Sequence, residues 1–185
     1  LDMPSGYAYA KALRTVKTCV GSEFCRFGTQ DSTQLGIDIE KAFDHMYGPH
    51  KIKFAVSGCP RNCAESGIKD VGIIGVDSGW EIYVGGNGGI KTEVAQFLCK
   101  VKNAEEVLEY SGAFIQIYRE EARYLDRTVH WIARVGLEYV KQRVLEDDEG
   151  RRAAYERLLY AVQGAANPWE TQIKEKSHQY EDITV

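Results

Sequence analysis

The stretch Ser57-Gly58-Cys59-Pro60-Arg61-Asn62-Cys63 decides the fold, because it ends a predicted strand and opens a loop that carries two cysteines. Residues 51–57 alternate between polar and apolar side chains and predict a short strand, which the following Gly-Cys-Pro interrupts. A second pair, Cys19 and Cys25, follows residues 11–18, which also predict a strand. The two pairs have the spacings C-x3-C and C-x5-C, and each lies in a loop that a fold can bring beside the other.

Four thiols from two loops match the ligand number of a tetrahedral zinc ion and also that of a 4Fe-4S cluster. Structural zinc sites usually have two to four residues between paired cysteines, and the five residues between Cys19 and Cys25 fall outside that range. Small residues in both loops, such as Gly21 and Gly58, would let backbone N–H groups approach the sulfurs of a bulky cluster. The residues alone leave three interpretations open: an iron–sulfur cluster, a zinc ion, or cysteines that are free or paired in disulfides.

Composition restricts the setting of these cysteines. The chain has five cysteines in 185 residues and no secretory leader, which argues against a disulfide framework and favours reduced, cytoplasmic surroundings. The fifth, Cys99, lies in a probable strand, where a buried thiol without a ligand role is the simplest interpretation.

With 23 basic and 27 acidic residues the net charge is −4, so no basic field predicts a nucleic-acid partner. No apolar run is long enough to predict a membrane span.

The rest of the first half predicts one helix and more strands. A helix is expected from the N-cap candidate Asp31-Ser32 to about Tyr47, with apolar residues on one face. Residues 85–89, four glycines and one asparagine, predict a flexible loop. Further strands are expected at residues 71–76, 80–84 and 96–101, the first two joined by the turn signal Asp77-Ser78-Gly79.

The second half predicts helices. Apolar residues between positions 103 and 144 recur at steps of three and four, which is typical of a long helix or a helix pair. Acidic residues 146–149 predict the start of a last helix over Arg151–Val162. The expected class is α+β, with helices packed on a mixed sheet and a helical segment after it. We expect a cofactor-binding core at 1–102, a helical part of the same domain at 103–166 and a polar tail at 167–185.

The segment from Ser57 to Ile73 resembles the signature of the nitrite and sulfite reductase family. That signature has Gly-Cys, three residues, Cys, and six residues before an acidic–aliphatic–small–aliphatic sequence, which Asp70-Val71-Gly72-Ile73 supplies here. The upstream C-x5-C is similar to the first cysteine pair of the family. Within the family, the surrounding residues are similar to the C-terminal part of the large subunit of NAD(P)H-dependent assimilatory nitrite reductases. The resemblance covers nearly the whole chain.

The resemblance implies two cofactors and a reaction. It implies that Cys19, Cys25, Cys59 and Cys63 hold a 4Fe-4S cluster, and that Cys63 also bridges to the iron of a siroheme. It implies a relay of electrons from NAD(P)H, through an upstream FAD and the cluster, to the siroheme, where nitrite is reduced to ammonium. The partners it implies are the absent N-terminal part of the polypeptide, which would supply the anion-binding residues, and a small reductase subunit.

Two alternatives to a nitrite reductase stay open on these residues. A sulfite reductase hemoprotein domain would share the same cysteines, and a zinc-stabilised structural module would use them differently. The opening Leu1-Asp2-Met3 does not look like a natural beginning, so we expect a piece of a longer protein that is inactive alone. No catalytic residue is identifiable within it.

Three polar residues beside the cysteines, and a series of arginines in the second half, have simpler expected roles. Asn62 is expected to support its loop through a left-handed backbone. Arg61 is expected in solvent, and Arg26 is either a surface cation or a counter-charge to the cluster. The series Arg119, Arg123 and Arg127, with acidic residues between them, predicts an ion-paired, solvated helix face.

Overall fold

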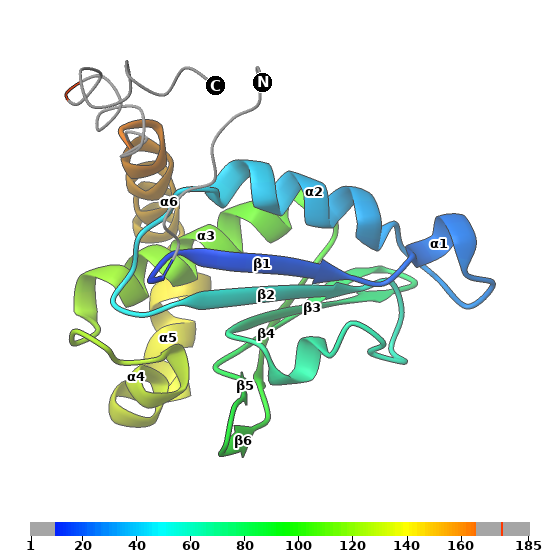
Figure 1. Ribbon diagram of the computed structural model, residues 1–185, viewed down its shortest axis with the longest axis horizontal. Helices are drawn as coiled ribbons and strands as arrows, with labels where there is room; N and C mark the ends of the chain where they lie inside the picture. Colours follow the sequence, from blue (N-terminus) through cyan, green and yellow to red (C-terminus); the bar gives the residue numbers. More distant parts are fainter. Residues whose placement is uncertain (1–9, 166–174, 176–185) are drawn as a thin grey trace, which may run out of the picture.

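The computed structural model describes residues 10–165 and residue 175. Its centre is a five-stranded mixed sheet in the order β1-β2-β3-β4-β7 (Figure 1). Strands β1, β2 and β3 are parallel, and β4 and β7 are antiparallel to their neighbours. The strand bounds are Leu13–Thr18 for β1, Ile52–Ser57 for β2, Val71–Val76 for β3, Gly79–Val84 for β4 and Gln96–Val101 for β7.

Helices α2 (Ser32–Phe43) and α3 (Ala104–Glu121) cover one face of the sheet, and α6 (Asp148–Gln163) packs on α3 (Figure 1). A small hairpin of β5 (Asn87–Gly88) and β6 (Thr92–Glu93) extends on the other side. The remaining elements are α1 (Gly21–Phe24), a 3-10 turn at Ser66–Ile68, α4 (Thr128–Val135), α5 (Leu137–Lys141) and a π-helical turn at Gln142–Glu146.

The core lies between the sheet and its helices and draws on both halves of the chain. Ile52, Phe54 and Val56 are fully buried at alternate positions of β2, as expected for the covered face of a strand. The rings of Phe54 and Phe43 are 5.8 Å apart, so β2 and α2 share this core. The helical second half contributes Trp131, also fully buried, to the same apolar cluster. The expected α+β class and mixed sheet are confirmed.

The predicted strands before the cysteines and the predicted hairpin are present. The helix predicted after the first cysteine pair is α2, which begins at Ser32. The Asp31 side chain accepts a hydrogen bond from the Gln34 N–H at 2.9 Å, as expected of an N-cap. It ends at Phe43 rather than Tyr47, because His45 takes a left-handed backbone with φ 64°. The glycine-rich segment 85–89 is not only a loop, since it supplies strand β5.

The prediction of one long helix between residues 103 and 144 is wrong, and the helix-pair interpretation is closer. Helix α3 ends at Glu121, and α4 begins only at Thr128. Between them Leu125 has a left-handed φ of 71°, and the Tyr118 hydroxyl donates to the carbonyl of Asp126. The Leu125 N–H also donates to the Pro49 carbonyl at 3.1 Å, and these contacts override the apolar periodicity of the segment.

The predicted last helix is present, but it begins at Asp148 rather than Arg151 and ends at Gln163. The Asp147 side chain caps it by accepting the Gly150 N–H. The predicted polar tail at 167–185 lies outside the described residues except for residue 175. Among the described residues, no helix is long and apolar enough to cross a membrane.

Candidate metal centre

Because β1 and β2 are parallel, their carboxyl ends lie at the same edge of the sheet. Cys19 follows β1 directly, and Cys59 comes two residues after β2. The Gly58 N–H donates to Cys19 Sγ at 3.1 Å, and the Cys19 N–H donates to the Val56 carbonyl at 3.2 Å. The two cysteine loops, which the sequence places about forty residues apart, are therefore bound to each other through Cys19 and the residues just before Cys59.

Glycines allow this close approach of the two loops. A Cβ on Gly58 would lie 2.9 Å from the Gly21 Cα, and one on Gly28 would lie 2.5 Å from the Gly21 carbonyl carbon. The carbonyl of Gly58 also accepts the backbone N–H groups of Thr29 and Gln30 at 2.8 and 3.0 Å. The small residues noted in the sequence thus hold the loops together through backbone contacts.

A second contact joins the loops on their outer side. The guanidinium of Arg61 lies 3.9 Å from the centre of the Phe27 ring, and that of Arg26 lies 4.5 Å from the same ring. Arg61 is exposed, as expected, and its stacking on Phe27 was not predicted. Two cations from the two cysteine loops therefore share the Phe27 ring.

The loop between Cys59 and Cys63 is shaped by Asn62, which confirms the structural role predicted for it. Its backbone is left-handed with φ 57°. Its side-chain oxygen lies 3.4 Å from the Ser57 hydroxyl and accepts the Gly67 N–H at 3.3 Å. The Ser57 and Ser66 hydroxyls are in turn hydrogen-bonded at 2.9 Å, so this loop is fixed from beneath.

The four paired thiols differ in exposure and in electrostatic surroundings. Cys59 is 8% exposed, Cys19 and Cys25 are half-buried, and Cys63 is exposed. Burial by itself raises the pKa of Cys19, but hydrogen bonds from the Gly58 N–H and the Ser32 hydroxyl lower that pKa below its usual value. Ser32 was missed as a site residue; its only signal was its place beside the predicted N-cap.

Cys99 is different from the four. It lies in β7, and burial raises the pKa of its thiol to about 12. The prediction that it takes no part in the site agrees with this position.

The donors present are suited to a cluster. Among the described residues, no three Cys, His, Asp or Glu side chains converge as they would around a single metal ion. A 4Fe-4S cluster distributes four thiolate ligands over separate iron atoms, and backbone N–H groups near its sulfurs are typical of such sites. The loops supply four thiols, an N–H donor at Cys19 and flanking glycines. That all four sulfurs meet in one hollow, with Cys63 as the bridge, stays a prediction.

Comparison with known proteins gives the family. The model of the nitrite and sulphite reductase 4Fe-4S domain matches residues 9–152. The chain is 58% identical over 176 residues to the nitrite reductase [NAD(P)H] of Bacillus subtilis (strain 168), covering 95% of this chain and 22% of that protein. It is 44% identical to the nitrite reductase (NADH) large subunit of Escherichia coli (strain K12), covering 87% of this chain and 19% of that protein.

Two solved structures share the fold. A crystal structure of dissimilatory sulfite reductase I has a TM-score of 0.66 at 15% identity and covers 72% of this chain and 52% of that one. The structure of the Mycobacterium tuberculosis NirA protein has a TM-score of 0.62 at 23% identity. The match covers 76% of this chain and 27% of that one. The chain belongs to the nitrite and sulphite reductase 4Fe-4S domain family. The resemblance seen in the signature residues is thereby confirmed, and the chain spans about a fifth of the two nitrite reductases.

Proposed function

We propose that this chain is the cluster- and siroheme-bearing part of an NAD(P)H-dependent nitrite reductase large subunit. The observation that carries the proposal is the pairing of two cysteine loops at the carboxyl ends of β1 and β2, joined by the Gly58 N–H and Cys19 Sγ. Family membership and the high identity to nitrite reductases support it.

In this proposal Cys19, Cys25, Cys59 and Cys63 are the cluster ligands. When bound, the 4Fe-4S cluster and siroheme supply the one-electron steps that together reduce nitrite to ammonium. The Gly58 N–H stabilises negative charge on the Cys19 sulfur, and the Ser32 hydroxyl lies 3.2 Å from that sulfur. Cys63 is the exposed member of the set, and exposure suits a sulfur that must also reach the iron of a second group.

Nitrite is favoured over sulfite by the relatives. The assimilatory-type sulfite reductase of Nitratidesulfovibrio vulgaris is 34% identical over 145 residues, against 58% and 44% for the two nitrite reductases. The binding of FAD and NAD(P)H, any contact with a small reductase subunit and most anion-binding residues are assigned to parts of the enzyme outside these 185 residues. The proposal also places the protein in the cytoplasm, since exposed cluster thiols need reducing surroundings.

Anaerobic reconstitution of the chain with iron and sulfide tests the ligand set. We expect iron and acid-labile sulfide in equal amounts and the electron paramagnetic resonance signal of a reduced cluster. Cys63→Ser should lose or strongly alter that signal, because it removes one thiolate ligand. Cys99→Ser is the matched control and should keep it, with about 1–3 kcal/mol of lost stability if the new hydroxyl stays unpaired.

Two results would contradict the proposal. One is a full cluster signal in Cys63→Ser, and the other is loss of the signal in Cys99→Ser. Stoichiometric zinc without iron or sulfide in freshly purified chain would instead support the structural zinc module.

A further inference from the structure

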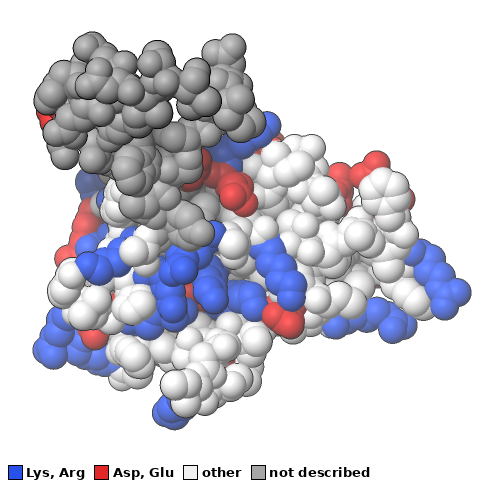
Figure 2. Space-filling model, in the orientation of Figure 1, with Lys and Arg blue, Asp and Glu red and all other residues white. Residues whose placement is uncertain are grey.

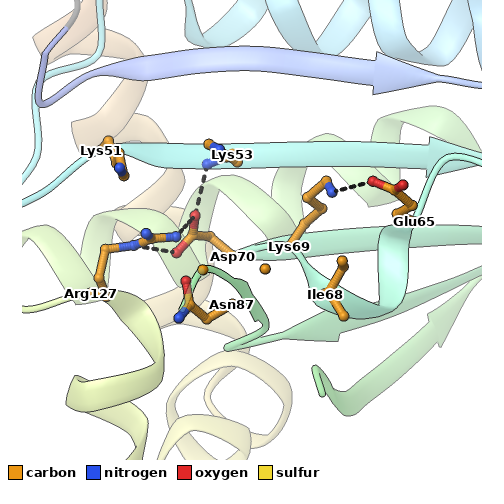
Figure 3. Close-up of a pocket in the computed structure, with 10 residues that line it drawn as sticks. Lys51, Lys53, Glu65, Ile68, Lys69, Asp70, Asn87 and Arg127 are labelled. Atoms are coloured by element: carbon orange, nitrogen blue, oxygen red, sulfur yellow. Dashed lines mark hydrogen bonds and ion pairs between the residues drawn. The ribbon is translucent and has the colours of Figure 1, made fainter. Parts of the chain in front are cut away.

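A basic hollow lies on the face of the sheet that α2 and α3 leave uncovered, and its lining runs from Lys51, before β2, to Glu65, two residues after Cys63. It has a volume of about 260 Å³ and is open to solvent. Its walls come from four separate segments: the start of β2, the turn before β3, the β5–β6 hairpin and the residue before α4 (Figure 3). The residues that carry the argument are Lys51, Lys53, Lys69, Arg127, Glu65 and Asp70.

The two acidic side chains of the hollow are already engaged. Asp70 accepts a hydrogen bond from Arg127 Nη2 at 2.7 Å, and Glu65 accepts one from Lys69 Nζ at 3.1 Å (Figure 3). Glu65 also pairs with Lys17 Nζ at 3.0 Å. Lys51 and Lys53 have no carboxylate partner among the described residues. The lining thus has four basic against two acidic side chains, with two ammonium groups left without a counter-charge.

The lowered pKa of Lys53 is consistent with a site where positive charges lack counter-charges. Burial lowers the pKa of Lys53, and the neighbouring charges of Lys51, Arg127 and Lys69 lower it further. Although the whole chain carries a net charge of −4, Figure 2 shows Lys and Arg side chains gathered on this face, over the start of β2 and near α4. An anion in the hollow would remove the mutual repulsion of these cations.

The walls are also built for close contact by a polar ligand. Gly85 and Gly86 donate backbone N–H groups to the carbonyls of Asp70 and Lys69 at 3.0 and 2.8 Å, so the hairpin is fixed on the turn before β3. Gly88 and Gly89 then line the hollow without side chains that would fill it. Since one water occupies about 30 Å³ in the liquid, the hollow has room for a small oxyanion and several waters.

We propose that this hollow binds an oxyanion group, a phosphate or a carboxylate, between Lys51 and Lys53. The proposal does not rest on the function proposed above. The charge and size of the site suit either a free phosphate-like ion or a carboxylate carried by a larger molecule, and two probes separate these sources.

Titration calorimetry of the 185-residue chain with inorganic phosphate and with citrate, at constant ionic strength, tests the site. We expect millimolar or tighter binding of at least one probe. Phosphate alone would indicate a free phosphate-like ion, and preferential citrate binding would indicate carboxylates. In an NMR titration with the same probe, the amide signals of Gly88 and Gly89 should shift first, which locates the binding.

The double variant Lys51→Gln/Lys53→Gln should weaken binding at least about tenfold, which corresponds to about 1.4 kcal/mol. The matched control is Lys41→Gln/Lys100→Gln, which removes the same charge from exposed positions of α2 and β7 outside the hollow and should bind like wild type. Circular dichroism checks that both variants fold. Absence of binding by either probe, or equal weakening in both double variants, would overturn the proposal.

Discussion

The thiols of Cys19 and Cys99 are held in opposite ways. Cys19 has the Gly58 N–H and the Ser32 hydroxyl at its sulfur, and these contacts lower its pKa. For Cys99, burial is the main cause that raises the pKa to about 12. The sequence placed Cys19 in a loop after a strand and Cys99 within a strand, and both placements are confirmed. It could not show Ser32, whose contact depends on how α2 approaches β1.

The raised pKa of Cys99 predicts an alkaline loss of stability. In the unfolded chain this thiol ionises near 9.0, and in the folded chain near 12, so between these values the folded state holds more protons. The free energy of unfolding should therefore fall as pH rises through that interval. Cys99→Ser cannot ionise there and should show a shallower fall in urea titrations at several pH values. Part of the fall should remain, since burial also raises the pKa of Tyr118. Parallel curves for wild type and variant would refute the assignment.

At the scale of elements, Asp70 joins β2, β3 and α4. It precedes β3, is fully buried, and accepts the Lys53 backbone N–H at 2.9 Å. From α4 it accepts the Thr128 hydroxyl at 2.6 Å, and from the preceding residue the Arg127 guanidinium at 2.7 Å. The predicted solvated face is therefore wrong for Arg127, whose side chain is only 13% exposed. No local pattern could show this, because the partners lie 57 residues apart.

Removal of the Asp70 carboxylate should separate these elements. Asp70→Ala leaves the Arg127 charge largely buried without its partner, and we expect a loss of about 3–5 kcal/mol in the free energy of unfolding. Asp70→Asn keeps an acceptor and should lose less. Asp38→Ala is the control, since that carboxylate on α2 accepts its hydrogen bond from Gln34 of the same helix and its loss should change stability far less. Urea denaturation measures all three, and similar losses for Asp70→Ala and Asp38→Ala would contradict this role.

At the scale of the molecule, local patterns predicted the strands and most helices, and long-range contacts decided the rest. The order of β1, β2 and β3 in the sheet places both cysteine loops at one edge, which the paired spacings had already indicated. The basic hollow was not predicted, because its lysines come from β2 and the turn before β3 and its arginine from the start of α4. The net charge of −4 even pointed away from a basic site, since a total charge does not report local grouping.

The pairing of the two cysteine loops predicts how the whole chain responds to its cluster. In the apo chain, the exposed loops at residues 20–28 and 58–65 should exchange amide hydrogens faster than the buried strands β2 and β3. One cluster ligated from both loops would restrain them together, so both should gain protection on anaerobic reconstitution, in the same samples and to a similar extent. Helix α6 packs on α3, and its protection should not change, which makes it the internal control. Hydrogen exchange followed by mass spectrometry measures all three regions. Protection gained by only one loop would mean that the two cysteine pairs do not share a cluster, even if iron and sulfide are bound.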